Sequence, residues 1–145
     1  MTDLPDELAG RSPEEVLAFL RESDDAAIRE AVHGIGTPVV LELLFGGMAG
    51  RFGPSPGRGT DRLAFALDDD GTEHVHVVEL DAAGARTVAP GPAARATLRT
   101  TLVRFLRVAA GAEDPKKAFL LGRLRISGDP VWAVRTLASM DRPGA

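Results

Sequence analysis

The chain has 145 residues and a mass of 15.3 kDa, which fits one domain of ordinary size. It is 44% hydrophobic and 26% charged, a composition typical of a folded globular protein and unlike that of a disordered, collagen-like or coiled-coil chain. The net charge of −4 argues against general nucleic-acid binding, and the absence of cysteine excludes disulfides, thiolate metal sites and cysteine nucleophiles.

The N-terminal third predicts helices. Ser12 precedes Pro13 and stands three residues before Glu15, which forms a capping box and predicts a helix over 13–22. A second helix is expected over 25–33, and a third begins at Pro38. The stretch 46–59 holds six glycines and two prolines, so we expect a loop or a broken helix end there.

The middle of the chain predicts an antiparallel meander. Three apolar stretches are separated by the turn residues Asp69-Asp70-Gly71 and Ala82-Ala83-Gly84. A further strand follows Pro90-Gly91-Pro92. These four strands are expected over 63–67, 73–80, 85–89 and 95–100.

The last third predicts helix, strand and helix. Leu102, Phe105 and Leu106 recur at helical spacing, and Gly111 closes that helix. After a short turn over 115–119, the alternation over 120–127 indicates a fifth strand. Asp129-Pro130 then begins a final helix. The order of elements predicts an α+β fold, not a parallel α/β sheet.

The two parts of the chain differ in charge. Residues 1–90 carry seven arginines against 17 acids, a net of −10, whereas residues 91–145 carry ten basic residues against four acids, a net of +6. Either the basic part pairs with the acidic part within one fold, or it offers a cationic patch to phosphate groups, acyl-coenzyme A or an anionic membrane surface.

Few residues are arranged for chemistry. His74 and His76 alternate on an expected strand and so share a face, but the sequence offers no evident third metal ligand. Asp68, Asp69 and Asp70 indicate a turn, because the pattern of a calcium loop is missing. The serines lack an elbow motif, and the glycine runs lack a nucleotide-binding pattern. The sequence therefore predicts no catalytic residues, metal or cofactor.

The C-terminal third has an apolar surplus. The last helix carries Trp132 on one side and Val131, Val134 and Ala138 on another, so its apolar arc is broad. Such a helix suits a position between a core and a ligand cavity.

Residues 111–129 resemble the signature of the sterol carrier protein type 2 family, the non-specific lipid-transfer domains. The pattern has Ala-Phe, a Gly-basic-Leu-basic-Ile strand and Gly-Asp before the last helix. Arg123 and Arg125 stand where lysines are common in the family. The matching residues are Ala118, Phe119, Gly122, Leu124, Ile126, Gly128 and Asp129. A looser resemblance covers residues 28–140, and its upstream part is similar to bacterial members of the family.

The resemblance implies a five-stranded, mostly antiparallel sheet with helices packed on one face, enclosing an apolar tunnel that is partly closed by the C-terminal helix. Family members hold sterols, fatty acids, acyl-coenzyme A or phospholipids there. By position, the residues expected near such a tunnel are Phe105, Leu106, Phe119, Leu120, Trp132 and Met140.

The expected organisation has three parts: an N-terminal helical extension over 1–27, a lipid-binding domain over 28–140 and a disordered tail over 141–145. The extension is not part of the family's minimal domain. Three roles remain open for the extension: covering a sheet edge, closing the cavity or pairing two subunits.

We therefore expect a stand-alone carrier that binds a sterol-like, fatty acyl, acyl-coenzyme A or polyketide-like molecule in an internal cavity. Its Arg-rich C-terminal half is expected to favour an anionic head group or acyl-coenzyme A. Two alternatives remain open: an enzyme that cyclises, isomerises or hydrolyses an apolar substrate in the same cavity, and an interaction module with a filled core. No apolar run approaches the roughly 20 residues of a membrane span, and the N-terminus lacks signal-peptide features, so the expected location is cytoplasmic. The oligomeric state is left open.

Overall fold

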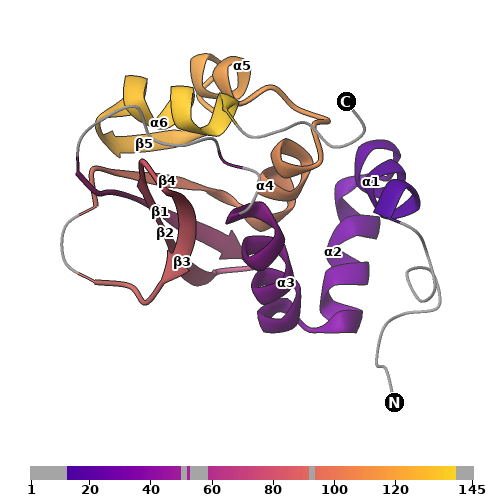
Figure 1. Cartoon of the computed structure of the whole chain (residues 1–145). Helices are drawn as coiled ribbons and strands as arrows, with labels where there is room; N and C mark the ends of the chain where they lie inside the picture. The colour runs from indigo at the N-terminus through magenta and orange to yellow at the C-terminus, as the bar shows by residue number, and fades with distance from the viewer. Residues whose placement is uncertain (1–12, 50–51, 53–58, 92–93, 140–145) are drawn as a thin grey trace.

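A computed structural model describes residues 13–49, 52, 59–91 and 94–139, which form an α+β fold (Figure 1). The helices are α1 (Pro13–Glu22), α2 (Asp25–Ile35), α3 (Thr37–Ala49), α4 (Leu102–Ala109), α5 (Pro115–Leu120) and α6 (Pro130–Ala138). The strands are β1 (Asp61–Asp69), β2 (Thr72–Asp81), β3 (Gly84–Val88), β4 (Ala96–Thr101) and β5 (Arg125–Gly128).

The five strands form one sheet in the order β3-β2-β1-β4-β5. Neighbouring strands are antiparallel except β1 and β4, so the expected mostly antiparallel sheet is confirmed. The β1–β2 turn has φ of 50° at Asp70 and 90° at Gly71, and positive φ at both central residues is what a tight hairpin requires. The meander predicted from the turn residues therefore forms as expected.

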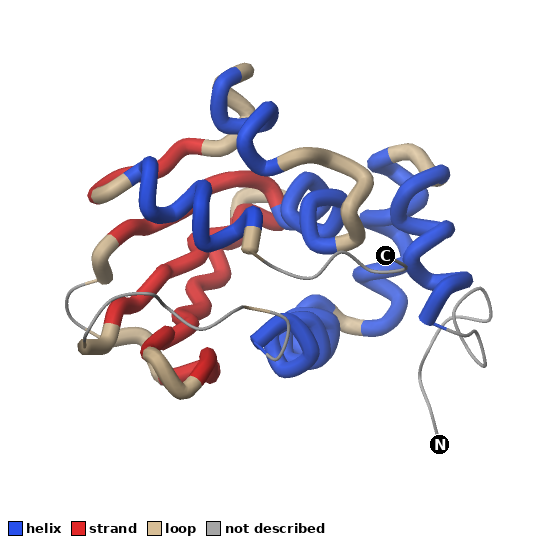
Figure 2. Tube along the Cα trace, turned by 45° about the horizontal axis from the view of Figure 1, so that its top comes forward, coloured by secondary structure: helices blue, strands red, loops and turns tan. Residues whose placement is uncertain are grey.

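Alternate residues of β1 point into the core. Leu63, Phe65 and Leu67 are fully buried, and the ring of Phe65 contacts Phe45 of α3 at 5.1 Å and Phe105 of α4 at 5.1 Å between centroids. Helix α6 adds Ala133 and Leu137 to the same cluster. Helices from both ends of the chain thus cover one face of the sheet, with α5 at the outer edge of the molecule (Figures 1 and 2).

Arg107 of α4 holds the corner between α1 and α2. Its guanidinium donates to the carbonyl oxygens of Leu20 at 3.2 Å and Ser23 at 2.6 Å, and it contacts the carboxylate of Asp25 at 2.8 Å. Both helices lie beside α4 (Figure 1). The boundary of the N-terminal extension at residue 27 stays a prediction, and the tail over 141–145 lies outside the described residues.

Two elements differ from the sequence-based expectation. Helix α3 runs on to Ala49, past Gly46, where the sequence predicts a loop or a broken helix end. It does so because Phe45 is buried against the sheet and its packing outweighs the low helix propensity of glycine. Residues 115–120 form a helix, and the fifth strand begins only at Arg125. Pro115 at the first turn and the buried Ala118 favour this helix, while Gly122 ends it with φ of 74°.

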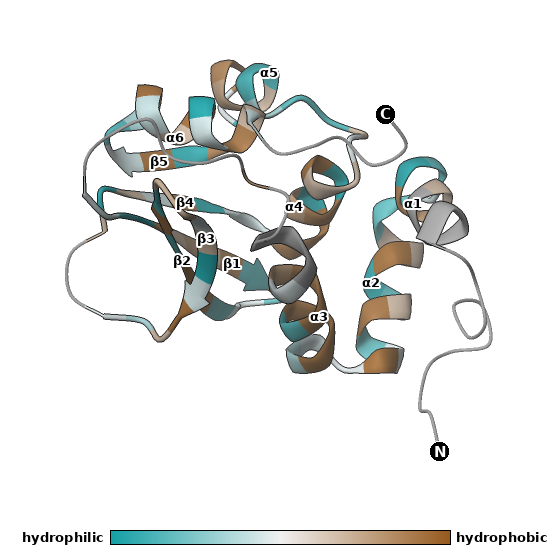
Figure 3. Cartoon of the chain, in the orientation of Figure 1, coloured by the Kyte–Doolittle hydropathy of each residue, from teal (hydrophilic) through white to brown (hydrophobic). Residues whose placement is uncertain are grey.

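The described helices include none with the length and hydropathy needed to cross a bilayer. The hydropathy of the chain follows the fold instead, since the inner sides of the helices and the central strands are apolar (Figure 3).

Candidate functional site

A groove of about 380 Å³ lies between α5 and α6. Helix α5 contributes residues spaced three and four apart, and α6 contributes residues spaced four apart, so one stripe of each helix faces the groove. The lining residues are Lys116, Phe119, Leu120, Pro130, Val131, Val134, Arg135 and Ala138.

Two Asp-Pro pairs position the helices of the groove. The side chain of Asp114 accepts a hydrogen bond from the Lys116 N–H at 3.0 Å, and that of Asp129 accepts one from the Trp132 N–H at 3.0 Å. Each proline occupies the first helical turn, where a missing N–H costs nothing. The sequence thus sets the start of both groove helices locally.

The Asp129 carboxylate also experiences a favourable charge environment. The hydrogen bond from the Trp132 N–H lowers the pKa of Asp129 below its usual 3.8; partial burial opposes this shift, and the nearby Arg95 and Arg135 reinforce it. Asp129 therefore stays ionised and bound to the start of α6 at neutral pH.

The lining is apolar in the middle and cationic at the rim. Leu120 is 71% exposed and Val131 is 61% exposed, so the groove is open to solvent along that side. Lys116 and Arg135 are exposed, and neither takes part in an ion pair between described residues. The lining within the described part of the chain holds no acid, histidine or serine. Such a surface can hold an apolar chain and an anion, but it offers no acid and base pair for proton transfer.

Trp132 lies on the other side of α6. Its ring is partly buried against the core, and the Arg95 guanidinium carbon lies 4.8 Å from the ring centroid. Arg95 in turn pairs with Asp61 at 3.0 Å and Asp129 at 3.1 Å. This network connects β1, β4 and α6, so it holds the helix that forms one wall of the groove.

The six residues expected near a ligand are separated in the structure. Phe119 and Leu120 line the groove. Phe105 and Leu106 are buried in the core, and Trp132 packs against Arg95 and the core. Met140 lies outside the described residues. The ligand-binding role of all six stays a prediction, as does the enclosed tunnel.

Of the eight lining residues, only Phe119 and Leu120 are among the predicted ligand-binding residues. The other six are Lys116, Pro130, Val131, Val134, Arg135 and Ala138. A signal for three of these exists in the sequence, because Pro130, Val134 and Ala138 recur at intervals of four, on a different stripe from the buried Ala133 and Leu137. The spacing of residues within α6 does not show, however, that α5 packs beside this second stripe.

The histidines lie elsewhere. The ring of His76 stacks on Phe45 at 4.6 Å, and burial, together with the neighbouring His74, lowers the pKa of His76 below 6.5. Neither His74 nor His76 belongs to a set of ligands close enough for a metal within the described residues.

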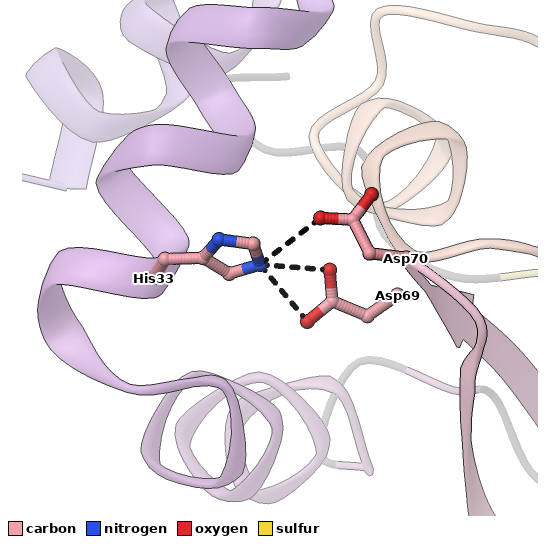
Figure 4. Close-up of side chains that lie close together, drawn as sticks. All are labelled: His33, Asp69 and Asp70. Carbon is pink, nitrogen blue, oxygen red and sulfur yellow. Dashed lines mark hydrogen bonds and ion pairs between the residues drawn. The ribbon is translucent and has the colours of Figure 1, made fainter.

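Among the described side chains, one group does bring three possible metal ligands together. It consists of His33, Asp69 and Asp70, whose ligand atoms lie within 4.8 Å of one another (Figure 4). His33 Nε2 is 2.9 Å from Asp69, and Asp70 also pairs with Arg29 at 3.5 Å. These contacts make the group an ion-paired junction between α2 and the β1–β2 turn.

The model of the SCP-2 sterol transfer family matches residues 58–136. A search of curated proteins found no match.

Solved structures share the fold at low sequence identity. The MycE methyltransferase of the mycinamycin biosynthetic pathway aligns with a TM-score of 0.55 and 16% identity over 63% of this chain and 24% of its own. The sec-alkylsulfatase Pisa1 from Pseudomonas sp. aligns with a TM-score of 0.55 and 18% identity over 77% of this chain and 17% of its own. Palmitated SCP2L2 from Aedes aegypti aligns with a TM-score of 0.53 and 15% identity over 68% of this chain and 88% of its own. This chain thus spans a quarter or less of the two enzymes, and all three likenesses concern the fold.

Proposed function

Since this chain belongs to the SCP-2 sterol transfer family, we propose that it binds an acyl lipid in the groove between α5 and α6 and carries it. Membership supports lipid or sterol binding or transfer as the general function. The observation that carries the finer proposal is an apolar groove whose two rim cations have no ion-pair partner, and whose lining has no acid, among the described residues.

The apolar lining accounts for affinity. An alkyl chain gains about 0.8 kcal/mol for each methylene that leaves water, so a long chain binds without many polar contacts. Because the groove is open beside Leu120 and Val131, one side of a bound chain stays in contact with solvent. We therefore expect affinity to rise with chain length and selectivity among chains to be loose.

The rim favours an anionic head group. Lys116 and Arg135 offer ammonium and guanidinium donors that suit a carboxylate or a phosphate. A sterol, which is neutral, leaves both cations without a partner. Fatty acids therefore fit best among the expected ligand classes, and acyl-coenzyme A follows through its phosphates. The palmitated state of the SCP2L2 protein from Aedes aegypti supports an acyl ligand in this fold.

A groove-filling substitution tests the site. Ala138 lines the groove and is exposed, so Ala138→Trp fills the groove without entering the core. Ala26 is an exposed alanine on α2, which makes Ala26→Trp a matched control. We expect Ala138→Trp to weaken binding of a fluorescent long-chain fatty acid about tenfold or more, which is about 1.4 kcal/mol, and Ala26→Trp to leave it unchanged.

A second comparison tests the head group. Lys116→Gln and Arg135→Gln together should weaken binding of palmitate but not of palmityl alcohol, which has the same chain and no charge. Equal binding by Ala138→Trp and Ala26→Trp would place the ligand outside this groove. Failure of the native protein to bind fatty acids, acyl-coenzyme A or sterols would overturn carriage.

A further inference from the structure

The outer side of α5 and the adjacent side of α6 carry exposed apolar side chains next to basic ones. Leu121 is 56% exposed and directly follows the more exposed Leu120 at the end of α5, while Val131, also more exposed, lies on the α6 side of the groove. The basic residues of the same surface are Lys116, Lys117 and Arg135, all exposed. We call these six residues the α5–α6 docking face.

The basic residues of this face have no ion-pair partner among the described residues. The nearby acids are occupied, since Glu113 pairs with Arg104 at 2.9 Å and Asp129 pairs with Arg95 at 3.1 Å. Asp114 accepts the Lys116 backbone N–H. Arg135 does lower the pKa of Asp129, but at more than ion-pair distance. The face therefore presents positive charge outward.

Another exposed apolar surface of the molecule has a different charge. Leu43 and Val39 of α3 are exposed, but Glu42 stands between them in the sequence and is also exposed. This apolar surface of α3 therefore carries an acid, whereas that of α5 and α6 carries bases. Basic side chains do not accompany every exposed leucine.

We propose that the α5–α6 docking face binds an anionic membrane surface. Leucine and valine side chains insert among lipid head groups and acyl chains, while lysine and arginine ammonium and guanidinium groups contact lipid phosphates. Helix α5 lies at the outer edge of the molecule, where it can meet a flat surface ahead of the sheet (Figures 1 and 2). A bilayer matches this combination, because it offers both an apolar interior and a negative surface.

The docking face and the groove share Lys116, Leu120, Val131 and Arg135. A membrane bound here would therefore lie against the open side of the groove, so that an acyl chain passes between bilayer and protein without crossing water. The passage of an acyl chain rests on the proposed function, whereas membrane docking does not. Docking and lipid binding can be tested separately, because Leu121 and Lys117 belong to the docking face but do not line the groove.

Vesicle co-sedimentation tests the docking. The native chain is expected to sediment with vesicles of phosphatidylcholine containing about one-third phosphatidylglycerol, far more than with phosphatidylcholine alone, and to be released by high salt. Lys117→Glu is expected to weaken this binding at least about fivefold, and Leu121→Asp by a similar or greater factor. Both variants should keep the native affinity for a fatty acid in the absence of vesicles.

Matched controls come from α1 and α3, which contribute no residue to the docking face. Leu43→Asp changes a leucine that is 67% exposed, and Arg21→Glu reverses an exposed cation of α1; both should bind vesicles as the native chain does. Thermal unfolding confirms that each variant is folded. Absence of sedimentation by the native chain, or equal losses in Leu43→Asp and Leu121→Asp, would overturn the proposal. A native dimer that Leu121→Asp dissociates without vesicles would assign this face to a second copy instead.

Discussion

His33 Nε2 lies 2.9 Å from Oδ1 and 3.2 Å from Oδ2 of Asp69, joining the end of α2 to the end of β1 (Figure 4). Thr37 adds a hydroxyl that donates to the same carboxylate at 2.8 Å. Burial alone would raise the pKa of Asp69, but the hydrogen bonds from His33 and Thr37, with the charges of His33 and His74, bring it below the usual 3.8. The junction is therefore built around an ionised Asp69, whose side chain is only 10% exposed.

Acid should weaken this junction. Since the pKa of Asp69 is lower in the folded than in the unfolded chain, the stability that its charge contributes is complete above about pH 4 and is lost as the pH falls through the lowered value. Asp69→Asn should cost about 2 kcal/mol of unfolding free energy at neutral pH, and the difference from the native chain should shrink below pH 4. Urea unfolding across this range measures it. Thr37→Val, which removes one donor, should have a smaller effect, and a difference that does not vary with pH would contradict the assignment.

Protonation of His76 should affect the free energy of unfolding at a higher pH than protonation of Asp69 does. Burial against Phe45, and then the charge of His74, lower the pKa of His76 below 6.5. As the pH falls, His76 therefore binds a proton in the unfolded chain before it does so in the folded chain. The stability that the neutral His76 ring contributes is complete above about pH 6.5 and falls as the pH drops below that value. His74→Gln should raise the pKa of His76 by removing a like charge, as measured by NMR titration of the His76 ring. A pKa of His76 that stays at its native value in His74→Gln would show that burial alone sets it.

The elements that sequence analysis predicted well depend on local chemistry. The turn at Asp70-Gly71 and the Asp129-Pro130 helix start require only neighbouring residues. The α5 region was harder, because Leu120 and Leu124 fit a strand alternation, while the cap at Asp114 and burial of Ala118 favour a helix. Packing decided between two locally acceptable patterns.

The residues of the candidate site also differ in whether local sequence or packing determines their place. The sequence predicts Phe119 and Leu120 because the family signature covers them, and both line the groove. It does not predict Lys116 and Arg135, since their place at the rim depends on how α5 packs beside α6. Similarly, His33 and Asp69 are 36 residues apart, and no periodicity of either segment predicts their contact.

Gly128 should tolerate no side chain. It has φ of 90°, and a Cβ there would collide with the carbonyl oxygen of Arg95 and approach the Cα of Ala96 to 3.0 Å. That carbonyl also accepts the Asp129 N–H, so it cannot move away without loss at the start of α6. Gly128→Ala should therefore destabilise the chain by about 3 kcal/mol or more.

Gly71 provides the control for that substitution. It has the same φ of 90°, but a Cβ there meets no atom within 4 Å. Gly71→Ala should cost only the conformational strain, about 1 kcal/mol. Comparison of the two thermal unfolding curves isolates the collision at Gly128, and equal losses would show that backbone strain explains both.

Val131 and Trp132 are neighbours on α6 with different surroundings, and their substitution should separate ligand binding from folding. Val131 lines the groove, whereas Trp132 packs against Arg95 and the core. Val131→Asp places a charge in the apolar lining, so it should weaken fatty-acid binding about tenfold with little change in unfolding free energy. Trp132→Ala should cost about 2 kcal/mol of stability, because it removes partly buried packing and the cation–π contact. Measured well below each variant's unfolding transition, binding should fall more in Val131→Asp; a greater loss in Trp132→Ala would place the ligand on the Trp132 side of the helix.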